Sequence, residues 1–245
     1  MQAQSVNLAS VTESSTWIPS TDGPRTLGER AFAALHEGIV SGDLKPGQRL
    51  RIEELAGALN MSHLPIREAI RQLENCGLVE HVPHRGARVT ELSIEDLIQI
   101  YDARLMFEPE IVRRGADNFT DADAAIAREA LDRHVEAGEQ DRRVEAWQAH
   151  TDFHFALYTP CRSAWLIRLA TPLWESSQRY RLTMSTLNAE QRRKEAAVEH
   201  EQLLAACVAH DGDRAATILH DHLVKSANLI TDQMGGERVF SLATA

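Results

Sequence analysis

The chain has 245 residues, of which 43% are hydrophobic and 25% charged, a composition that excludes disordered chains and small disulfide scaffolds. Its three cysteines are too few and too scattered for a disulfide framework or a cysteine-ligated zinc finger, which favours a reducing compartment, the cytoplasm. The net charge of −10, taken over the whole chain, argues against a nucleic-acid partner.

The charge is divided unevenly along the chain. Residues 24–91 carry nine basic and nine acidic side chains, whereas residues 92–245 carry 17 basic and 25 acidic ones. We therefore expect a flexible tail over 1–23, a first domain over 24–91, a second over 92–235 and a tail over 236–245. A neutral first domain can present a few arginines locally, so the net charge does not exclude DNA.

The first domain shows three short helical patterns and two β-runs. Apolar residues at helical spacing predict helices that end near 41, over 51–59 and from 62 to about 76. Two β-runs at 78–82 and 87–90 flank a turn and predict a hairpin. Three helices and a hairpin make a winged helix-turn-helix. The alternative is a small α/β module with a solvated helix face.

The third helix of this unit would be the recognition helix, since its outward face is polar and basic. Such a helix places side chains at base edges, and a hairpin tip reaches phosphates or the minor groove. The candidate DNA-binding residues are Arg51, Ser62, His63, Leu64, Arg67, Arg71, Arg85 and Gly86.

The second domain reads as six long helices with few breakers. Their expected ranges are 93–116, 120–137, 142–158, 163–184, 189–210 and 213–234. The fold class is therefore mainly α, a winged helix-turn-helix followed by an antiparallel six-helix bundle.

Four histidines fall on apolar helix faces of this bundle: His150, His154, His200 and His222. The first two are four residues apart, which puts two imidazoles on one face, as metal chelation requires. His220 lies on another side of its helix and should face solvent. A set of core histidines bonded to neighbours is the alternative, although four inward imidazoles each need a partner and one divalent ion satisfies all of them.

A second group of residues could bind a small anion. Arg104 and Glu108, near Tyr101, form either a surface ion pair or a guanidinium directed at a bound carboxylate. Ser177, Gln178 and Arg181 lie together on the fourth helix of the bundle and either join that site or form a solvated face.

Both halves of the chain resemble one known family. Residues 42–89, above all PIREA at 65–69 and the Gly-Leu-Val that leads into the hairpin, resemble the DNA-binding domain of GntR-family transcriptional regulators. The helical half resembles the FCD ligand-binding domain of the FadR subfamily at YDARLMFEPEIVRRGA (101–116), DFHFAL (152–157), EHEQLLAA (199–206) and HDHL (220–223). Six rather than seven helices suggests the VanR-like branch.

The resemblance implies a divalent metal held by one Asp and three His, which by position are His154, His200 and His222. The Asp position holds His150, and Asp152 points elsewhere on the helix. An all-imidazole shell carries no charge, so the bound ion keeps its +2 charge and attracts an anion. Neutral nitrogen ligands also favour zinc or nickel over Mg²⁺ or Mn²⁺. Two positions where the family often has Arg in its DNA-binding domain hold Glu53 and His63, which weakens any inference about the operator sequence.

We therefore expect a metabolite-responsive transcriptional repressor, a homodimer on a palindromic operator, that senses a small carboxylate such as a sugar acid, hydroxy acid or aromatic acid. The rival interpretation is a helical metalloenzyme acting on a small organic acid, although the chain has no Glu-x-x-His or His-Glu-x-x-His motif. A non-specific architectural DNA binder is a third class, and the neutral first domain argues against it.

Overall fold

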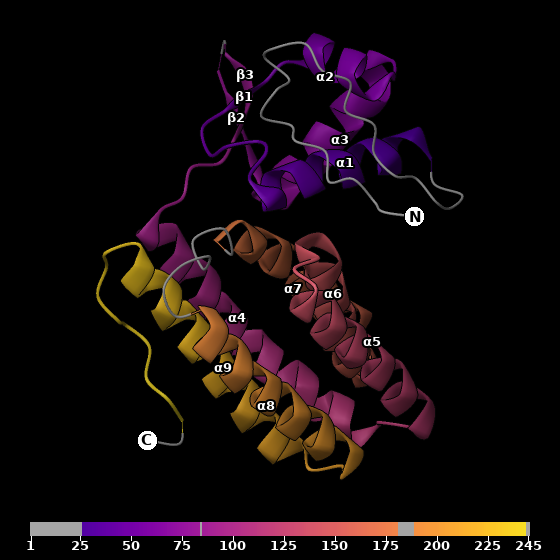
Figure 1. Ribbon diagram of the computed structural model, residues 1–245, viewed down its shortest axis with the longest axis vertical. Coiled ribbons are helices and arrows are strands. Elements are labelled where there is room, and N and C mark those ends of the chain that lie inside the picture. Colours follow the sequence, from indigo (N-terminus) through magenta and orange to yellow (C-terminus); the bar gives the residue numbers. More distant parts are fainter. Residues whose placement is uncertain (1–25, 84, 181–188, 244–245) are drawn as a thin grey trace. The chain divides into compact units, whose positions relative to one another are not determined.

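The computed structural model describes residues 26–83, 85–180 and 189–243. The chain divides into two compact units, Met1–Ser93 and Ile94–Ala245 (Figure 1). The predicted fold class is confirmed: the chain is mainly helical, with a helix-turn-helix and a small antiparallel wing followed by a helical unit. The predicted tail over 1–23 and the wing residue His84 lie outside the described residues.

The first unit holds three helices, α1 (Leu27–Ser41), α2 (Ile52–Leu59) and α3 (His63–Asn75). Helix α1 begins at a capping box, in which the Thr26 hydroxyl accepts from the Glu29 N–H and the Glu29 carboxylate accepts from the Thr26 N–H. Ser62 stands at the N-cap position of α3, but its side chain makes no capping hydrogen bond.

Helix α3 has a buried and an exposed face, as its sequence predicts. Its inward residues pack into the core of this unit: Ile66, Ala69, Ile70 and Leu73. Arg67 and Arg71 are exposed on the other face. Burial of the apolar stripe therefore orients the helix so that the face with Arg67 and Arg71 is exposed.

The wing is a three-stranded antiparallel sheet rather than a hairpin alone. Strands β1 (Arg49–Leu50), β2 (Val79–Val82) and β3 (Gly86–Val89) lie in the order β1-β3-β2, with Val79 opposite Val89 and Arg49 opposite Arg88. The sequence analysis missed β1 because two residues show no alternation. Gly86 has a φ of +80° at the tip, a conformation that a glycine adopts at little cost.

The second unit contains six α-helices within the described residues. They are α4 (Ile94–Asp117), α5 (Asp121–Glu139), α6 (Arg143–Tyr158), α7 (Ala164–Gln178), α8 (Ala189–Val208) and α9 (Gly212–Gln233), with a 3₁₀ turn, η2 (Thr159–Cys161), after α6. The α-helix of α7 ends at Gln178, and the part of the predicted helix beyond residue 180 lies outside the described residues.

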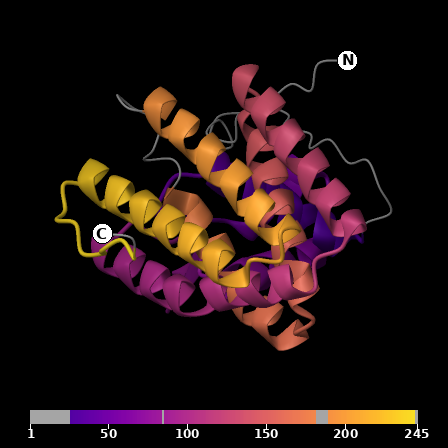
Figure 2. The same cartoon turned by 90° about the horizontal axis from the view of Figure 1, so that it is seen from below.

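Helix α4 packs against α6, α7, α8 and α9, and it lies alongside α9 in both views (Figures 1 and 2). Gly115 allows a close approach of α4 to α6. A Cβ at this position would stand 2.3 Å from the Leu157 carbonyl oxygen of α6, so only glycine fits. None of the described helices is long and apolar enough to cross a membrane.

The segment after α9, expected as a tail, folds back along that helix (Figure 1). The Asn228 side chain donates to the Phe240 carbonyl at 2.9 Å and accepts from its N–H at 3.4 Å. The Ala243 N–H donates to Asp221 at 2.7 Å. These bonds attach residues near the C-terminal end of the sequence to the helix that carries His222.

Candidate metal centre and nucleic-acid interface

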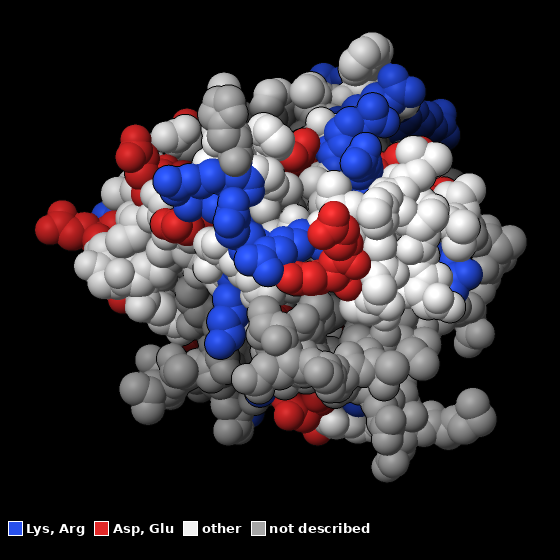
Figure 3. All heavy atoms as spheres, turned by 90° about the horizontal axis from the view of Figure 1, so that it is seen from above, with Lys and Arg blue, Asp and Glu red and all other residues white. Residues whose placement is uncertain are grey.

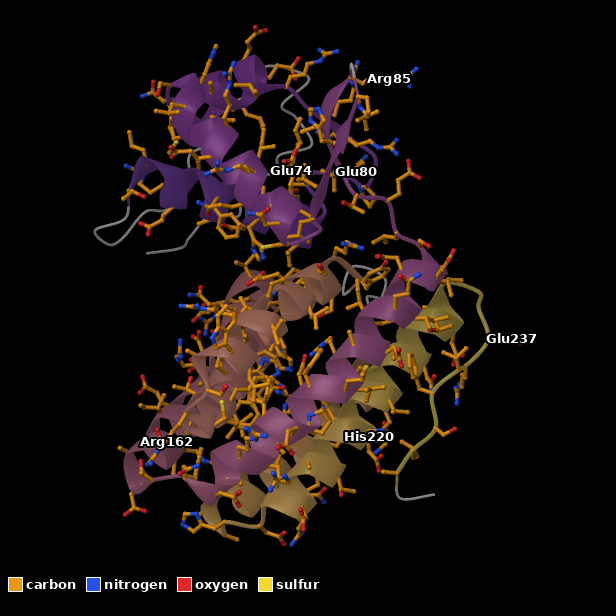
Figure 4. The ribbon with its side chains drawn as sticks, turned by 180° about the vertical axis from the view of Figure 1, so that it is seen from behind. Glu74, Glu80, Arg85, Arg162, His220 and Glu237 are labelled. Atoms are coloured by element: carbon orange, nitrogen blue, oxygen red, sulfur yellow. The ribbon has the colours of Figure 1, made fainter. Side chains whose placement is uncertain are left out.

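A groove of about 560 Å³ runs between α3 and the wing. Six of the predicted DNA-binding residues line it: Arg51, His63, Arg67, Arg71, Arg85 and Gly86. The recognition helix and the hairpin tip therefore form one surface, and Figure 4 labels Arg85 at that tip. The other two predicted residues, Ser62 and Leu64, are exposed at the start of α3, Leu64 with 66% of its surface accessible.

The groove also holds residues that the sequence analysis did not select. Arg49 of β1 donates to the Arg85 carbonyl at 2.8 Å and so ties the tip of the wing to the first strand. Glu53 and Glu74 line the same groove. Seen from above, patches of Lys and Arg alternate with Asp and Glu (Figure 3). The surface suits a focused contact with DNA better than binding through bulk charge.

The second unit brings four buried histidines together. His150 and His154 project from α6, His200 from α8 and His222 from α9, each at most 8% exposed. One ligand nitrogen from each lies within 4.8 Å of the other three. His220, predicted to face solvent, is not one of the four; its side chain is 28% exposed and lies 3.0 Å from Asp221, and Figure 4 labels it on α9.

The cluster has the dimensions of a metal site. Zinc bonds to imidazole nitrogen of about 2.0 Å place tetrahedral ligands about 3.3 Å apart. The Nε2 atoms of His150 and His154 are 3.2 Å apart. The residues present therefore fit a divalent ion with nitrogen ligands.

A carboxylate supports the cluster from outside. Nδ1 of His222 lies 2.7 Å from an oxygen of Glu199, whose other oxygen accepts from Lys225 at 3.0 Å. A carboxylate at Nδ1 fixes the ring and its tautomer and directs Nε2 toward a metal. Sequence reasoning missed Glu199, because its contact with His222 joins two helices and no spacing rule indicates it.

Aromatic rings close one side of the cluster. Trp174 of α7 stacks on the His150 ring at 5.5 Å with 23° between the planes and lies 4.9 Å from the His154 ring. A fifth histidine, His134 of α5, lies 5.0 Å from the His150 ring and binds the Ala146 carbonyl through Nδ1. The sequence analysis did not select either residue.

The residues predicted to bind a small anion lie around a buried ion pair. Arg104 donates from Nε and Nη2 to the two oxygens of Glu108 at 2.6 and 3.0 Å, and from Nη1 to Ser177 at 3.0 Å. Its guanidinium also lies 5.0 Å from the Tyr101 ring and 4.9 Å from the Trp174 ring. The surface ion pair considered above is therefore wrong, since both side chains are buried.

Glu108 holds the guanidinium in the two-pronged geometry that a ligand carboxylate would otherwise take. Burial opposes the charge of Arg104, but Glu108 and the nearby tyrosines outweigh it and raise the pKa of the guanidinium. Tyr158 donates to Glu108 at 2.7 Å, and burial followed by the neighbouring carboxylate raises the pKa of this phenol. The group links α4 to α6 and α7 with no net charge.

The residues expected beside Arg104 on α7 are partly in place. Ser177 contacts Arg104, and Gln178 is buried and contacts Thr151, the residue after His150. Both are therefore buried and do not form the solvated face considered as an alternative. Arg181 lies outside the described residues.

Comparison with known families explains why these two units occur together. Residues 27–89 match the family described as "Bacterial regulatory proteins, gntR family", and residues 99–225, over half of the chain, match the FCD domain. The chain belongs to the GntR family of bacterial regulators. Within that family it is one of the FCD-containing, FadR-like regulators.

Individual relatives span nearly the whole of this GntR regulator. The HTH-type transcriptional repressor GlaR of Escherichia coli is 29% identical over 89% of this chain and 99% of its own. The transcriptional regulator BphR of Paraburkholderia xenovorans is 30% identical over 84% of this chain and 86% of its own. The solved structure of E. coli McbR/YncC superposes with a TM-score of 0.75 at 25% identity, covering 86% of this chain and 99% of that one.

GlaR and BphR are both named as transcriptional regulators. The chain is accordingly a DNA-binding regulator and not the helical metalloenzyme considered as the rival interpretation.

Proposed function

We propose that this GntR regulator is a repressor whose affinity for its operator is controlled by a small carboxylate bound to a divalent metal ion in the helical unit. The observation that carries the proposal is the group of four buried imidazoles, His150, His154, His200 and His222. The ion would supply a cationic anchor, and an oxygen ligand would join the four imidazoles by raising the coordination number of the ion above four.

The donor set favours zinc or nickel. Four neutral imidazoles suit borderline metals, whereas Mg²⁺ and Mn²⁺ prefer oxygen ligands. Because neutral ligands leave the ion its full charge, an anion gains more from binding here than at a site with a carboxylate ligand. Arg104 is already neutralised by Glu108, so the metal would be the main partner of the effector carboxylate.

The predicted anion-binding residues around Arg104 would form the wall that faces the effector. Three of the five N–H groups of Arg104 are engaged by Glu108 and Ser177, and the remaining two would donate to the effector. Tyr101 lies against the same guanidinium. Gln178, which contacts Thr151 next to His150 in the sequence, and Arg181 would add polar groups to this wall.

The operator would be read by the groove of the winged unit in a homodimer. Two-fold symmetry places two recognition helices one turn of DNA apart and requires a palindromic operator. The protein would act in the cytoplasm, where bacterial DNA lies. Effector and operator binding are linked, so each changes the affinity for the other by the same factor.

Metal analysis tests the central part of this proposal. Protein prepared without chelators should contain about one zinc or nickel ion per chain. A chelator should lower its melting temperature, and added zinc should restore it. His222→Ala should lose the ion, whereas His220→Ala, two residues away on α9, should retain it. Wild-type protein with no metal and no response to added zinc or nickel would exclude the site.

A second measurement tests the regulation. A panel of carboxylates should contain one that stabilises the metal-loaded protein and weakens operator binding in a gel shift. Both effects should vanish after chelation. An acid that acts equally well on the metal-free protein would show that the histidine cluster does not bind the effector.

A further inference from the structure

The groove of the winged unit contains an acidic side chain among its arginines. Glu53, near the start of α2, lines the groove together with Arg49, Arg51, Arg67, Arg71 and Arg85. Glu53 is exposed, and its side chain makes no hydrogen bond or ion pair with any residue that the structure describes. Other carboxylates nearby have partners, since Glu54 binds Arg51 at 2.7 Å and Glu74 lies 3.9 Å from His81.

Stabilisation of α2 does not account for the position of Glu53 in the groove. A carboxylate in the first turn of a helix stabilises it through the helix dipole. Glu54 lies in the same turn, supplies this effect and also pairs with Arg51. Glu53 therefore adds a negative charge to the surface that would contact DNA without a second structural role of its own.

This carboxylate is unfavourable toward most of the surface of a DNA duplex. The phosphates repel it, and so do the acceptors on the base edges of the major groove, which are guanine N7 and O6, adenine N7 and thymine O4. The hydrogen-bond donors on those edges are the amino groups of cytosine and adenine. Glu53 therefore lowers the affinity for DNA unless one of these amino groups donates to it.

Cytosine suits a carboxylate better than adenine does. The adenine amino group lies between two acceptors, adenine N7 and thymine O4, and both repel a negatively charged oxygen. The cytosine amino group has an acceptor on one side only, the guanine O6 of its own pair. That guanine can in turn accept from an arginine, and Arg67 and Arg71 line the same groove as Glu53.

We propose that Glu53 selects a cytosine in each half of the operator by accepting a hydrogen bond from its amino group, and that it weakens binding to other DNA by repelling the phosphates. This inference rests on the part of the proposed function that assigns operator recognition to the groove. It does not depend on the metal ion or on the effector. The arginines of the groove attract any DNA, whereas Glu53 penalises every sequence without the cytosine.

Removal of a single amino group from the DNA tests the base contact with the full-length protein. Selection from a random DNA pool first supplies the operator sequence. Each cytosine of a half-site is then replaced by 2-pyrimidinone, which lacks the amino group but keeps the opposing guanine. At one of these cytosines the wild type should lose roughly tenfold in affinity in a gel shift. Glu53→Met, which keeps the length of the side chain but removes the acceptor, should lose less than about twofold there.

Removal of the charge tests the repulsion of other DNA. Glu53→Gln keeps the shape of the side chain, and it should bind unrelated DNA roughly two- to tenfold more tightly than the wild type at low salt. High salt should abolish this gain, because it screens the charge. Glu80→Gln is the matched control, since it removes the same charge from a residue that pairs with Arg88 on the wing and does not line the groove. It should bind unrelated DNA as the wild type does.

The outcomes separate this inference from the proposed function. Wild-type protein that tolerates 2-pyrimidinone at every cytosine of the half-site overturns the base contact. An equal loss in Glu53→Met overturns the role of Glu53 as acceptor, and unchanged binding of unrelated DNA by Glu53→Gln overturns the repulsion. Selection of no operator sequence by the wild type overturns operator recognition through the groove as well. The wild-type substitutions decide the base contact even if a variant fails to fold.

Discussion

Nδ1 of His222 lies 2.7 Å from Oε2 of Glu199, and this contact joins α9 to the helix that carries His200. The carboxylate holds one of the four clustered imidazoles in a single orientation. Lys225 in turn holds Glu199 at 3.0 Å. A chain of three side chains therefore determines the position of one proposed metal ligand.

Glu199→Gln should weaken metal binding without removing a ligand. The amide holds the His222 ring less firmly and lowers its basicity, so we expect a loss of about 10- to 100-fold in affinity for zinc. Competition with a chromophoric chelator measures this. Glu201→Gln, on the same helix but exposed and paired with Arg128, is the control and should bind zinc normally. Equal affinities in the two variants would contradict the role of Glu199.

Glu108→Gln should destabilise the protein strongly. It leaves the Arg104 guanidinium buried without its counter-charge, which costs about 3–5 kcal/mol of unfolding free energy. Chemical denaturation of the metal-loaded protein measures the change. Glu110→Gln breaks only partly exposed pairs on the same helix and should cost less than about 1 kcal/mol. Similar losses of unfolding free energy in both variants would show that burial does not increase the cost of breaking the pair of Arg104 and Glu108.

Arg67→Ala should abolish specific operator binding. Arg67 is exposed on α3 and lines the groove, where an arginine that reads a base contributes about 1–3 kcal/mol. Gel shifts at fixed salt, with operator and with unrelated DNA, measure specificity. Arg143→Ala changes an exposed arginine of the helical unit and should leave binding intact. Retained specificity in Arg67→Ala would remove Arg67 from the interface.

Leu64 should read a thymine methyl group. It is 66% exposed at the start of α3, among polar and basic residues, and apolar contact with this methyl is a common means of base recognition. Replacing thymine by uracil, one half-site position at a time, should weaken binding of the wild type at one position. Leu64→Ala should be insensitive to that replacement. Uniform tolerance of uracil by the wild type would refute this contact.

The sequence predicted those features that depend on spacing within one helix. The four inward histidines, the pairing of Arg104 with Glu108 and the two faces of α3 all follow from a period of 3.6 residues. It did not predict contacts that depend on how helices pack, such as Glu199 with His222 or Gln178 with Thr151. For the same reason it left open whether the pair of Arg104 and Glu108 would be buried.

The contact between Gly115 and Leu157 has a mechanical consequence. With no side chain at Gly115, the backbone of α4 packs directly against the Leu157 carbonyl of α6, the helix that carries His150 and His154, so we expect a displacement of α6 to be felt by α4. Helix α4 begins at Ile94, only a few residues after the last strand of the wing ends at Val89. Because α4 follows the wing directly in the chain, any shift of α4 caused by occupancy of the histidine cluster would reach the DNA-reading unit through the short connection after Val89.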